Sequence, residues 1–358
     1  MPHPQSTNGH AAPTDPVATG AGWFGRARSV TPRPPATRWQ KVLAGLMIGY
    51  AVALVLLCLW MYWQGDREWL ATLVLFGPRW VCGLPLPFLA LAAAIWHRRL
   101  LWVAALSALV LVFPFLGLVL HWPASAAPAT RLRVLTCNVD QNALDPQKLA
   151  QAIADNDADI VALQEINVVT RFVWPEGWHV LNRDEFILAS RYPIEELRYF
   201  THPLSPPEVA AVFYRVRLPD REVPIFNVHL RSPRPGIEAV LDKQANGPAQ
   251  LDDVLEVRAL ESEATAIWVE GINEPMIIAG DFNMPCESWI FRRDWTAWDN
   301  AFGRTGLGFG FTKISRLGPL EYGTRIDHVL YHEAWTCIGS WVGANIGSDH
   351  LPLVAEFR

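Results

Sequence analysis

The sequence predicts an α/β domain with packed sheets, preceded by a segment of helices that cross a membrane. The first third of the chain holds long apolar runs with almost no charge, and runs of about 20 apolar residues are typical of membrane-spanning helices. The rest of the chain alternates short apolar strands with a few helices. This second part has roughly 230 residues, which is enough to bury a full core.

The apolar runs predict three transmembrane helices, at residues 42–63, 69–96 and 100–122, within a membrane segment at 41–122. Trp, Tyr and His gather near the ends of the runs, as they do at membrane interfaces. The second run contains Gly77-Pro78 and two later prolines. A re-entrant pair of short helices is therefore the alternative for this run.

The distribution of Lys and Arg around the runs predicts the orientation of the chain. Three basic residues lie shortly before the first run, and a pair of arginines separates the second from the third. The connector at 64–68 holds one Arg and two acids. Because basic loops stay in the cytoplasm, we expect a multi-pass protein of a bacterial cytoplasmic (inner) membrane, with everything after Trp122 outside. A re-entrant second run would invert this orientation.

The segments that flank the apolar runs differ in composition. Residues 1–40 are rich in Pro, Ala, Thr and Ser, so we expect a disordered tail. Residues 123–130 form a predicted linker before a domain at 131–358. Residues 1–130 contain nine of the 30 Lys and Arg and three of the 35 Asp and Glu, which leaves 21 basic and 32 acidic residues, a net charge of −11, for that domain. Such a domain does not indicate a tight, sequence-independent nucleic-acid binder.

The elements of this domain follow from periodicity. Apolar or alternating runs predict strands near residues 131–138, 159–163, 179–190, 209–217, 223–230, 276–279, 325–332 and 351–357. Helices are predicted at 146–156 and 249–269. Asp145 is a favourable N-cap for the first helix, and Pro146 suits its first turn.

Polar side chains follow most of these strands at or near the point where each strand ends. They are Asn138, Glu165, His229, Asp281, Asn283, Asp327, Asp349 and His350. Each has an ordinary structural explanation when taken alone, such as a strand-end cap, an Asx-turn or a packed imidazole. Their shared position favours a single site instead, because carboxylates and amides can bind a metal ion and phosphate oxygens there.

Seven segments, most of which contain these residues, resemble in order the motifs of the endonuclease/exonuclease/phosphatase superfamily. They span residues 135–139, 160–165, 187–193, 227–229, 280–283, 325–330 and 348–352. The resemblance covers about residues 131–358 and not the membrane segment. It implies a four-layered α-β-β-α sandwich, a site between the edges of two central sheets, and metal-dependent hydrolysis of phosphate esters.

The resemblance also implies a metal site. Glu165 and Asn138 look like ligands of a Mg²⁺ or Mn²⁺ ion, and Asp349 looks like the carboxylate that completes this site or lies just outside it. Such oxygen ligands suit a hard cation. After His229 the chain has a Pro-rich loop with Arg231 and Arg234. Either these arginines bind an anionic head group, or the loop is simply solvated.

Catalytic roles follow from the same resemblance. Asp281 resembles the residue that orients and deprotonates the attacking water, and Asn283 resembles the amide that holds a phosphoryl oxygen. His350 matches the histidine on the scissile phosphate, as a general base or an electrostatic clamp. Asp327 matches the carboxylate that orients this histidine and raises its pKa. His229 matches a second histidine, a phosphate donor or leaving-group acid.

These inferences lead to one functional hypothesis with two alternatives. The hypothesis is an integral membrane enzyme that hydrolyses phosphodiesters, or phosphomonoesters, outside the cytoplasmic membrane, with a lipid head group favoured by the tether. The alternatives are an extracytoplasmic nuclease of the same superfamily and a catalytically inactive phosphate-binding module. No obligate protein partner is inferred, and the choice between Mg²⁺ and Mn²⁺ stays open.

Overall fold

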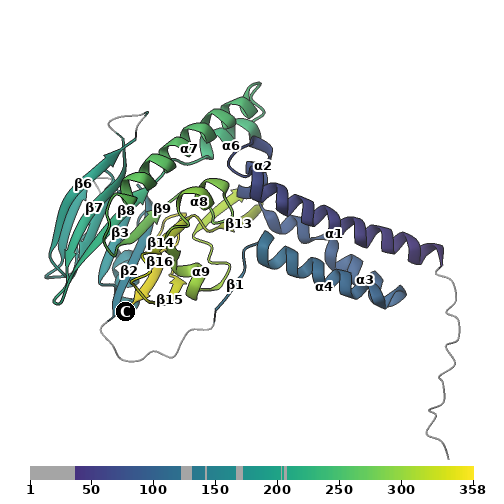
Figure 1. Cartoon of the computed structure of the whole chain (residues 1–358), viewed down its shortest axis with the longest axis horizontal. Coiled ribbons are helices and arrows are strands. Elements are labelled where there is room, and N and C mark those ends of the chain that lie inside the picture. The colour runs from purple at the N-terminus through teal and green to yellow at the C-terminus, as the bar shows by residue number, and fades with distance from the viewer. Residues whose placement is uncertain (1–36, 122–130, 142, 167–171, 203, 205–207) are drawn as a thin grey trace, which may run out of the picture.

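The structure is a computed structural model that describes residues 37–121, 131–141, 143–166, 172–202, 204 and 208–358. Figure 1 shows a bundle of helices that projects from a domain built around two sheets. Residues 37–40 of the predicted tail belong to the start of the first helix. The rest of the tail and the predicted linker at 123–130 lie outside the described residues.

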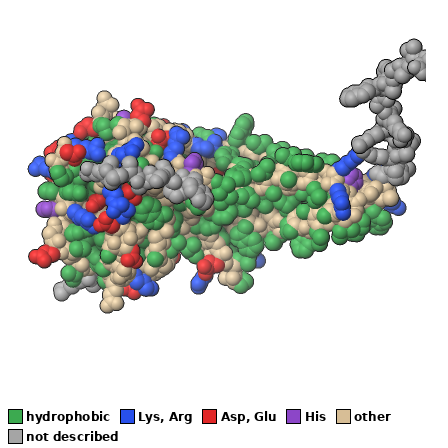
Figure 2. All heavy atoms as spheres, turned by 90° about the horizontal axis from the view of Figure 1, so that it is seen from below, with side chains coloured by type: hydrophobic (Ala, Val, Ile, Leu, Met, Phe, Trp, Pro, Cys, Tyr) green, Lys and Arg blue, Asp and Glu red, His purple; other side chains and the backbone are tan. Residues whose placement is uncertain are grey.

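The helical bundle is apolar on its outside. Three of its helices are long and apolar enough to cross a membrane, by length and composition, at Arg38–Gln64, Arg79–Trp96 and Arg98–Phe115. They comprise α1 (Arg38–Gln64), η1 (Arg79–Gly83), α3 (Pro85–Trp96), η2 (Arg98–Leu100), α4 (Leu101–Val110) and the π-helical turn η3 (Leu111–Phe115). Apolar side chains cover the face of the bundle seen in Figure 2, whereas charged side chains gather on the sheet domain.

The predicted second helix at 69–96 is interrupted. Helix α2 (Trp69–Phe76) ends before Gly77-Pro78, and η1 begins at Arg79. Pro78 has no N–H to continue the helix and restricts the residue before it. As a result, α2 leaves the bundle and packs against α7 (Gly247–Glu270) of the sheet domain.

Two six-stranded sheets form the centre of the domain. The first has the order β15 (Cys337–Val342), β16 (Leu353–Phe357), β2 (Leu132–Gln141), β3 (Ile160–Ile166), β5 (Phe186–Ser190), β4 (His179–Arg183). The second has the order β10 (Asp299–Asn300), β14 (Asp327–Tyr331), β9 (Ile277–Asp281), β8 (Glu222–His229), β7 (Val209–Arg217), β6 (Ile194–Thr201). Two small ribbons pair β1 (Val119–Leu120) with β11 (Leu307–Gly308) and β12 (Lys313–Leu317) with β13 (Leu320–Thr324).

The sheets pack face to face, and helices cover their outer faces. Alternating side chains of both sheets, among them Val134, Ile160, Val212 and Ile277, form the central core. Helix α5 (Pro146–Asp155) covers the first sheet, and α7 and α8 (Trp289–Asp294) cover the second. The predicted four-layered sandwich is confirmed. Two short helices, α6 (Arg234–Leu241) and α9 (Ala301–Thr305), lie in connections.

Some elements differ from those that periodicity predicted. The stretch 179–190 forms a hairpin of β4 and β5 and not one strand, with Asp184 at a φ of 51° in the turn. Asp tolerates this left-handed backbone better than most residues do. Strands β6, β12, β13 and β15 were not predicted, because their polar and glycine residues weaken the apolar alternation.

The bundle is joined to the sheet domain by buried polar contacts. The Arg258 guanidinium on α7 donates to Asp66 Oδ1 at 2.8 Å, and both side chains are fully buried. The Trp289 N–H donates to the Gly65 carbonyl. Arg79, at the start of the second span, lies 3.6 Å from Glu287 in the loop after β9. The end of α1 and the break after α2 are therefore parts of one interface with the domain.

Replacing Asp66 with Asn tests this interface. The variant leaves the buried Arg258 without a carboxylate, and breaking a buried pair in this way costs about 3 kcal/mol or more. We expect the melting temperature of the full chain in detergent to fall by at least about 6 °C. Glu321→Gln, which removes the partner of Arg316 in an exposed pair, is the matched control and ought to change stability by less than about 1 kcal/mol. Equal melting temperatures for the two variants would contradict the assigned role of the pair.

Candidate active site

Strand register in the second sheet aligns three of the predicted site residues. His229 at the end of β8 lies opposite Asp281 at the end of β9, and Asp281 lies opposite Asp327 at the start of β14. Gly280 permits this close pairing, because a Cβ there would lie 1.9 Å from the Val228 carbonyl oxygen. A row of one imidazole and two carboxylates therefore crosses the edge of the sheet.

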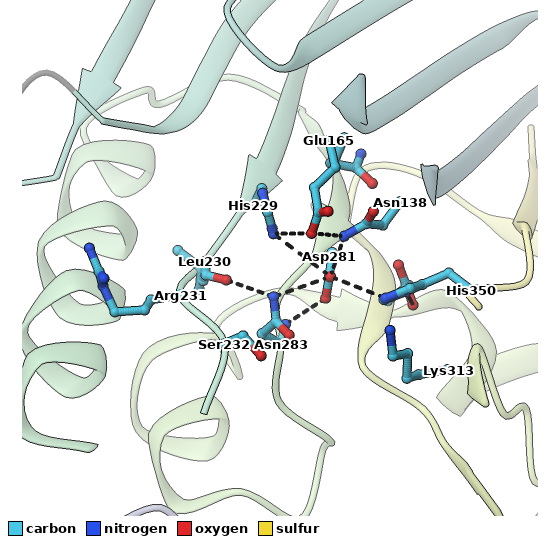
Figure 3. Close-up of polar contacts among 12 residues, drawn as sticks. Asn138, Glu165, His229, Leu230, Arg231, Ser232, Asp281, Asn283, Lys313 and His350 are labelled. Carbon is cyan, nitrogen blue, oxygen red and sulfur yellow. Dashed lines mark hydrogen bonds and ion pairs between the residues drawn. The ribbon is translucent and has the colours of Figure 1, made fainter. Parts of the chain in front are cut away.

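The first sheet contributes Asn138 from β2 and Glu165 from β3 to the same place (Figure 3). The Asn138 amide donates to Glu165 Oε1 at 2.8 Å and to Asp281 Oδ2 at 3.0 Å. Its Oδ1 accepts the Asp140 N–H at 3.0 Å. Asn138 thus joins the two sheets at the site and turns its N–H groups toward the carboxylates, so its role as a metal ligand stays a prediction.

Asp281 lies at the centre of the group and is fully buried. The backbone N–H of Asn283 donates to Asp281 Oδ1 at 2.8 Å. The Asn283 side-chain amide donates to Asp281 Oδ2 at 3.2 Å and to the Leu230 carbonyl at 2.8 Å. Burial raises the pKa of Asp281 and the nearby Asp327 adds to this, although His350 and His229 act in the opposite direction. Asn283 therefore holds Asp281 in place, and its phosphoryl-binding role stays a prediction.

His350 pairs with Asp327 in the buried interior of the site. Its Nδ1 lies 2.9 Å from Asp327 Oδ2, and its Nε2 lies 3.7 Å from Asp281 Oδ2. Burial alone would lower the pKa of His350, but the negative charges of Asp327 and Asp281 outweigh it, and the pKa is raised. The imidazole is thus oriented by one carboxylate and directed at another, and both negative charges favour its cationic form.

His229 has a carboxylate partner that sequence reasoning missed. Its Nδ1 lies 2.6 Å from Glu185 Oε1, and its Nε2 lies 3.5 Å from Glu165 and 3.9 Å from Asp281. Burial would lower the pKa of His229, but the bond to Glu185 and the surrounding negative charges raise it to about 10. Glu185 lies in the turn between β4 and β5, where it follows no motif that would single it out.

Asp349 lies beside two basic groups. Lys313 Nζ forms a short contact with Asp349 Oδ2, and Arg234 lies 3.4 Å from the same oxygen. Arg231 instead contacts Glu208 at 2.6 Å, and its side chain points away from Asp281 in Figure 3. Only Arg234 of the predicted pair thus reaches the site. Lys313 was missed because its position at the start of a polar hairpin carries no sequence signal.

A divalent cation suits the carboxylates at the open edge of the site. The side chains of Glu165 and Asp349 are 27% and 36% exposed, and Asp349 Oδ1 is buried without a hydrogen-bond partner among the described residues. Hard cations take such oxygens and keep several waters. Asp281, Asp327 and His350 also bring ligand atoms within 4.8 Å of one another, but Asp327 and His350 already bind each other. The roles of Glu165 and Asp349 as metal ligands stay predictions.

Asp327→Asn tests the charge that acts on His350. Removing the negative charge leaves burial as the stronger effect, so the pKa of His350 falls and the imidazole becomes neutral at a lower pH than in the wild type. NMR titration of the full chain with labelled histidine measures this, with His350→Gln to assign the signal. His179, exposed on β4, is the internal control and ought to give the same signals in both proteins. An unchanged His350 titration would contradict the assigned pairing.

Several solved structures match this chain at low similarity. The 3'-5' exonuclease NExo from Neisseria meningitidis is 19% identical, with a TM-score of 0.49, and the match covers 63% of this chain and 100% of that one. D. rerio TDP2, complexed with a single-strand DNA product, is 14% identical, with a TM-score of 0.47 over 64% of this chain and 100% of that one. The human Nocturnin catalytic domain, with a bound sulfate anion, is 17% identical, with a TM-score of 0.44 over 64% and 93%.

The comparisons with family models and with curated proteins identify the family of the chain. No curated protein sequence matches the chain. The model of the Endonuclease/Exonuclease/phosphatase family matches residues 135–350, a range that begins in β2 and ends at His350 and therefore contains every predicted site residue. This match confirms the resemblance seen in the motifs, and the chain belongs to the Endonuclease/Exonuclease/phosphatase family.

Proposed function

We propose that the protein is a membrane-anchored, divalent-metal-dependent phosphoesterase that hydrolyses phosphodiester or phosphomonoester bonds outside the cytoplasmic membrane. The observation that carries this proposal is the setting of Asp281. Its buried Oδ2 lies between the Nε2 atoms of His350 and His229, at 3.7 and 3.9 Å. These distances are too long for direct hydrogen bonds, so both imidazoles stay available to a water that approaches Oδ2.

The proposed mechanism uses this water as the nucleophile. Asp281, whose pKa is raised by burial, accepts the proton of the water as it attacks phosphorus in line with the leaving oxygen. The cationic His350 stabilises negative charge on the phosphoryl oxygens. His229 lies beside the same water and is also cationic, so it is placed to donate to a phosphoryl oxygen, while the leaving oxygen on the far side of phosphorus takes its proton from solvent. When bound by Glu165 and Asp349, Mg²⁺ or Mn²⁺ would supply Lewis-acid polarisation of the phosphoryl group.

The charge at the far end of the bundle supports the proposed orientation. Arg38 and Lys41 open the first span, and Arg98 and Arg99 lie between the second and third. The Gln40 side chain donates to the Trp96 carbonyl at 2.8 Å, so these basic groups share the end of the bundle that is remote from the sheets. Under the positive-inside rule, this end would face the cytoplasm of a bacterium, and the catalytic domain would lie outside the inner membrane.

Hydrolysis of bis-(p-nitrophenyl) phosphate tests the proposed function. We expect the full chain to release p-nitrophenol with Mg²⁺ or Mn²⁺ and to release none with EDTA. In Asp281→Ala and in His350→Ala, the rate of release is expected to fall at least about 10²-fold, the scale of removing one preorganised catalytic group. Asp220→Ala removes an exposed carboxylate remote from the site and is the matched control. The full chain is required, because a domain without the bundle would leave the buried Arg258 without its carboxylate partner, Asp66.

The same assay with other substrates distinguishes the remaining alternatives. Comparison with p-nitrophenyl phosphate separates diester from monoester specificity. Phospholipid vesicles are compared with duplex DNA: a lipid head group as the substrate, which the membrane tether favours, predicts turnover of the lipid, whereas preferred cleavage of DNA would indicate an extracytoplasmic nuclease. No hydrolysis of any ester by the folded, metal-saturated protein would indicate a phosphate-binding module and overturn the proposal.

A further inference from the structure

An apolar cavity adjoins the proposed active site on the side of the membrane segment. It has a volume of about 290 Å³, near the lower end of the roughly 300–1,000 Å³ of small-molecule sites. Three parts of the chain form its walls: the break between α2 and η1, helix α6, and the β12–β13 hairpin. The apolar wall residues include Leu73, Phe76, Pro78, Ile237, Leu241 and Leu317.

One end of this cavity reaches the catalytic groups. Asn283, Lys313 and Arg234 belong to its lining. A second cavity, of about 680 Å³, continues past Asp349 to Asp140 and shares with the first Arg234, Ile237, Leu241, Lys313, Ser315 and Tyr322. An apolar space and a more polar space thus adjoin along these residues, and the cationic Lys313 and Arg234 lie where they meet. This arrangement suits an amphiphile that carries an anionic phosphate between an apolar and a polar part.

The cavity also borders the start of the second candidate membrane span. Phe76 and Pro78 directly precede Arg79, where the second span begins. Trp63 at the end of α1 and Trp80 after the break are exposed, as expected for side chains at a membrane interface. An acyl chain that leaves the outer leaflet would therefore meet the cavity before it meets the sheet domain.

We infer that this cavity binds the part of a phospholipid next to its phosphate, the glycerol and the first segment of an acyl chain. The inference rests on the proposed function for its substrate phosphate and adds a lipid subsite that the catalytic motifs do not contain. Lys313 and Arg234 provide the charge complementary to an anionic phosphate. The apolar walls provide hydrophobic contact with the chain, at the depth where the chain leaves the bilayer.

Photo-crosslinking tests the subsite without turnover. The full chain is reconstituted in vesicles of phosphatidylethanolamine and phosphatidylglycerol that contain phosphatidylglycerol with a diazirine on its acyl chain, and EDTA is present. We expect labelled peptides from α6 and from the β12–β13 hairpin. Leu241→Glu, which puts a charge in the cavity wall, ought to reduce this labelling by at least about tenfold, since apolar contact and charge burial each contribute on that scale.

Leu260→Glu is the matched control for this variant. Leu260 on α7 and Leu241 on α6 are 49% and 48% exposed, but only Leu241 lines the cavity. Labelling by Leu260→Glu at the wild-type level is therefore expected. Equal labelling of α6 in both variants, or labelling confined to the three spans, would overturn the lipid subsite.

Measurements of hydrolysis distinguish the case in which the subsite is wrong from the case in which the proposed function is wrong. In an active protein, Leu241→Glu is expected to lower the ratio of phospholipid to bis-(p-nitrophenyl) phosphate turnover by at least about tenfold. An unchanged ratio would overturn the subsite while the esterase function stands. Labelling of α6 in a protein that hydrolyses no ester would support the subsite and overturn the function.

Discussion

The position of the candidate active site relative to the helical bundle depends on one buried guanidinium. Arg258 donates to Asp66 from the bundle, to the Arg231 carbonyl after β8 and to the Asn283 carbonyl after β9, at 2.8 to 2.9 Å. A buried cation is tolerated only when its N–H groups are paired. The loops that follow β8 and β9 are therefore held against the end of α1. The same contacts bring the break after α2 close to the site.

The site beside Arg258 contains buried charges and strained backbone conformations that a structural role alone would not require. Asp281 is buried between two imidazoles and next to a second carboxylate, Asp327. Glu165 and Asn283 have φ values of 55° and 51°, which cost free energy in residues other than glycine. Such strain persists where the surrounding structure imposes it, and it is concentrated at functional sites. Here both strained residues touch the group that surrounds Asp281.

Much of the domain could be predicted because its signals are local. Apolar runs indicated most central strands, and ordered motifs indicated the family and the residues at the strand ends. Prediction did less well where a break or a hairpin competed with an apolar run, as at Gly77-Pro78 and Asp184. The sequence did not identify Lys313 or Glu185 as site residues, because the residues that they contact, Asp349 and His229, lie 36 and 44 residues away in the chain. Those contacts depend on strand register and on the packing of the two sheets.

The sequence by itself determined the three apolar runs, the family, and the polar residues that could act on a phosphate ester. These properties follow from composition, periodicity and short motifs, which need no knowledge of distant contacts. The tertiary structure alone decided that Arg234 and not Arg231 faces Asp349, and that the break after α2 lines a cavity beside Asn283. The physical reason is that side chains meet according to helix docking and sheet packing, which bring together segments from opposite ends of the chain.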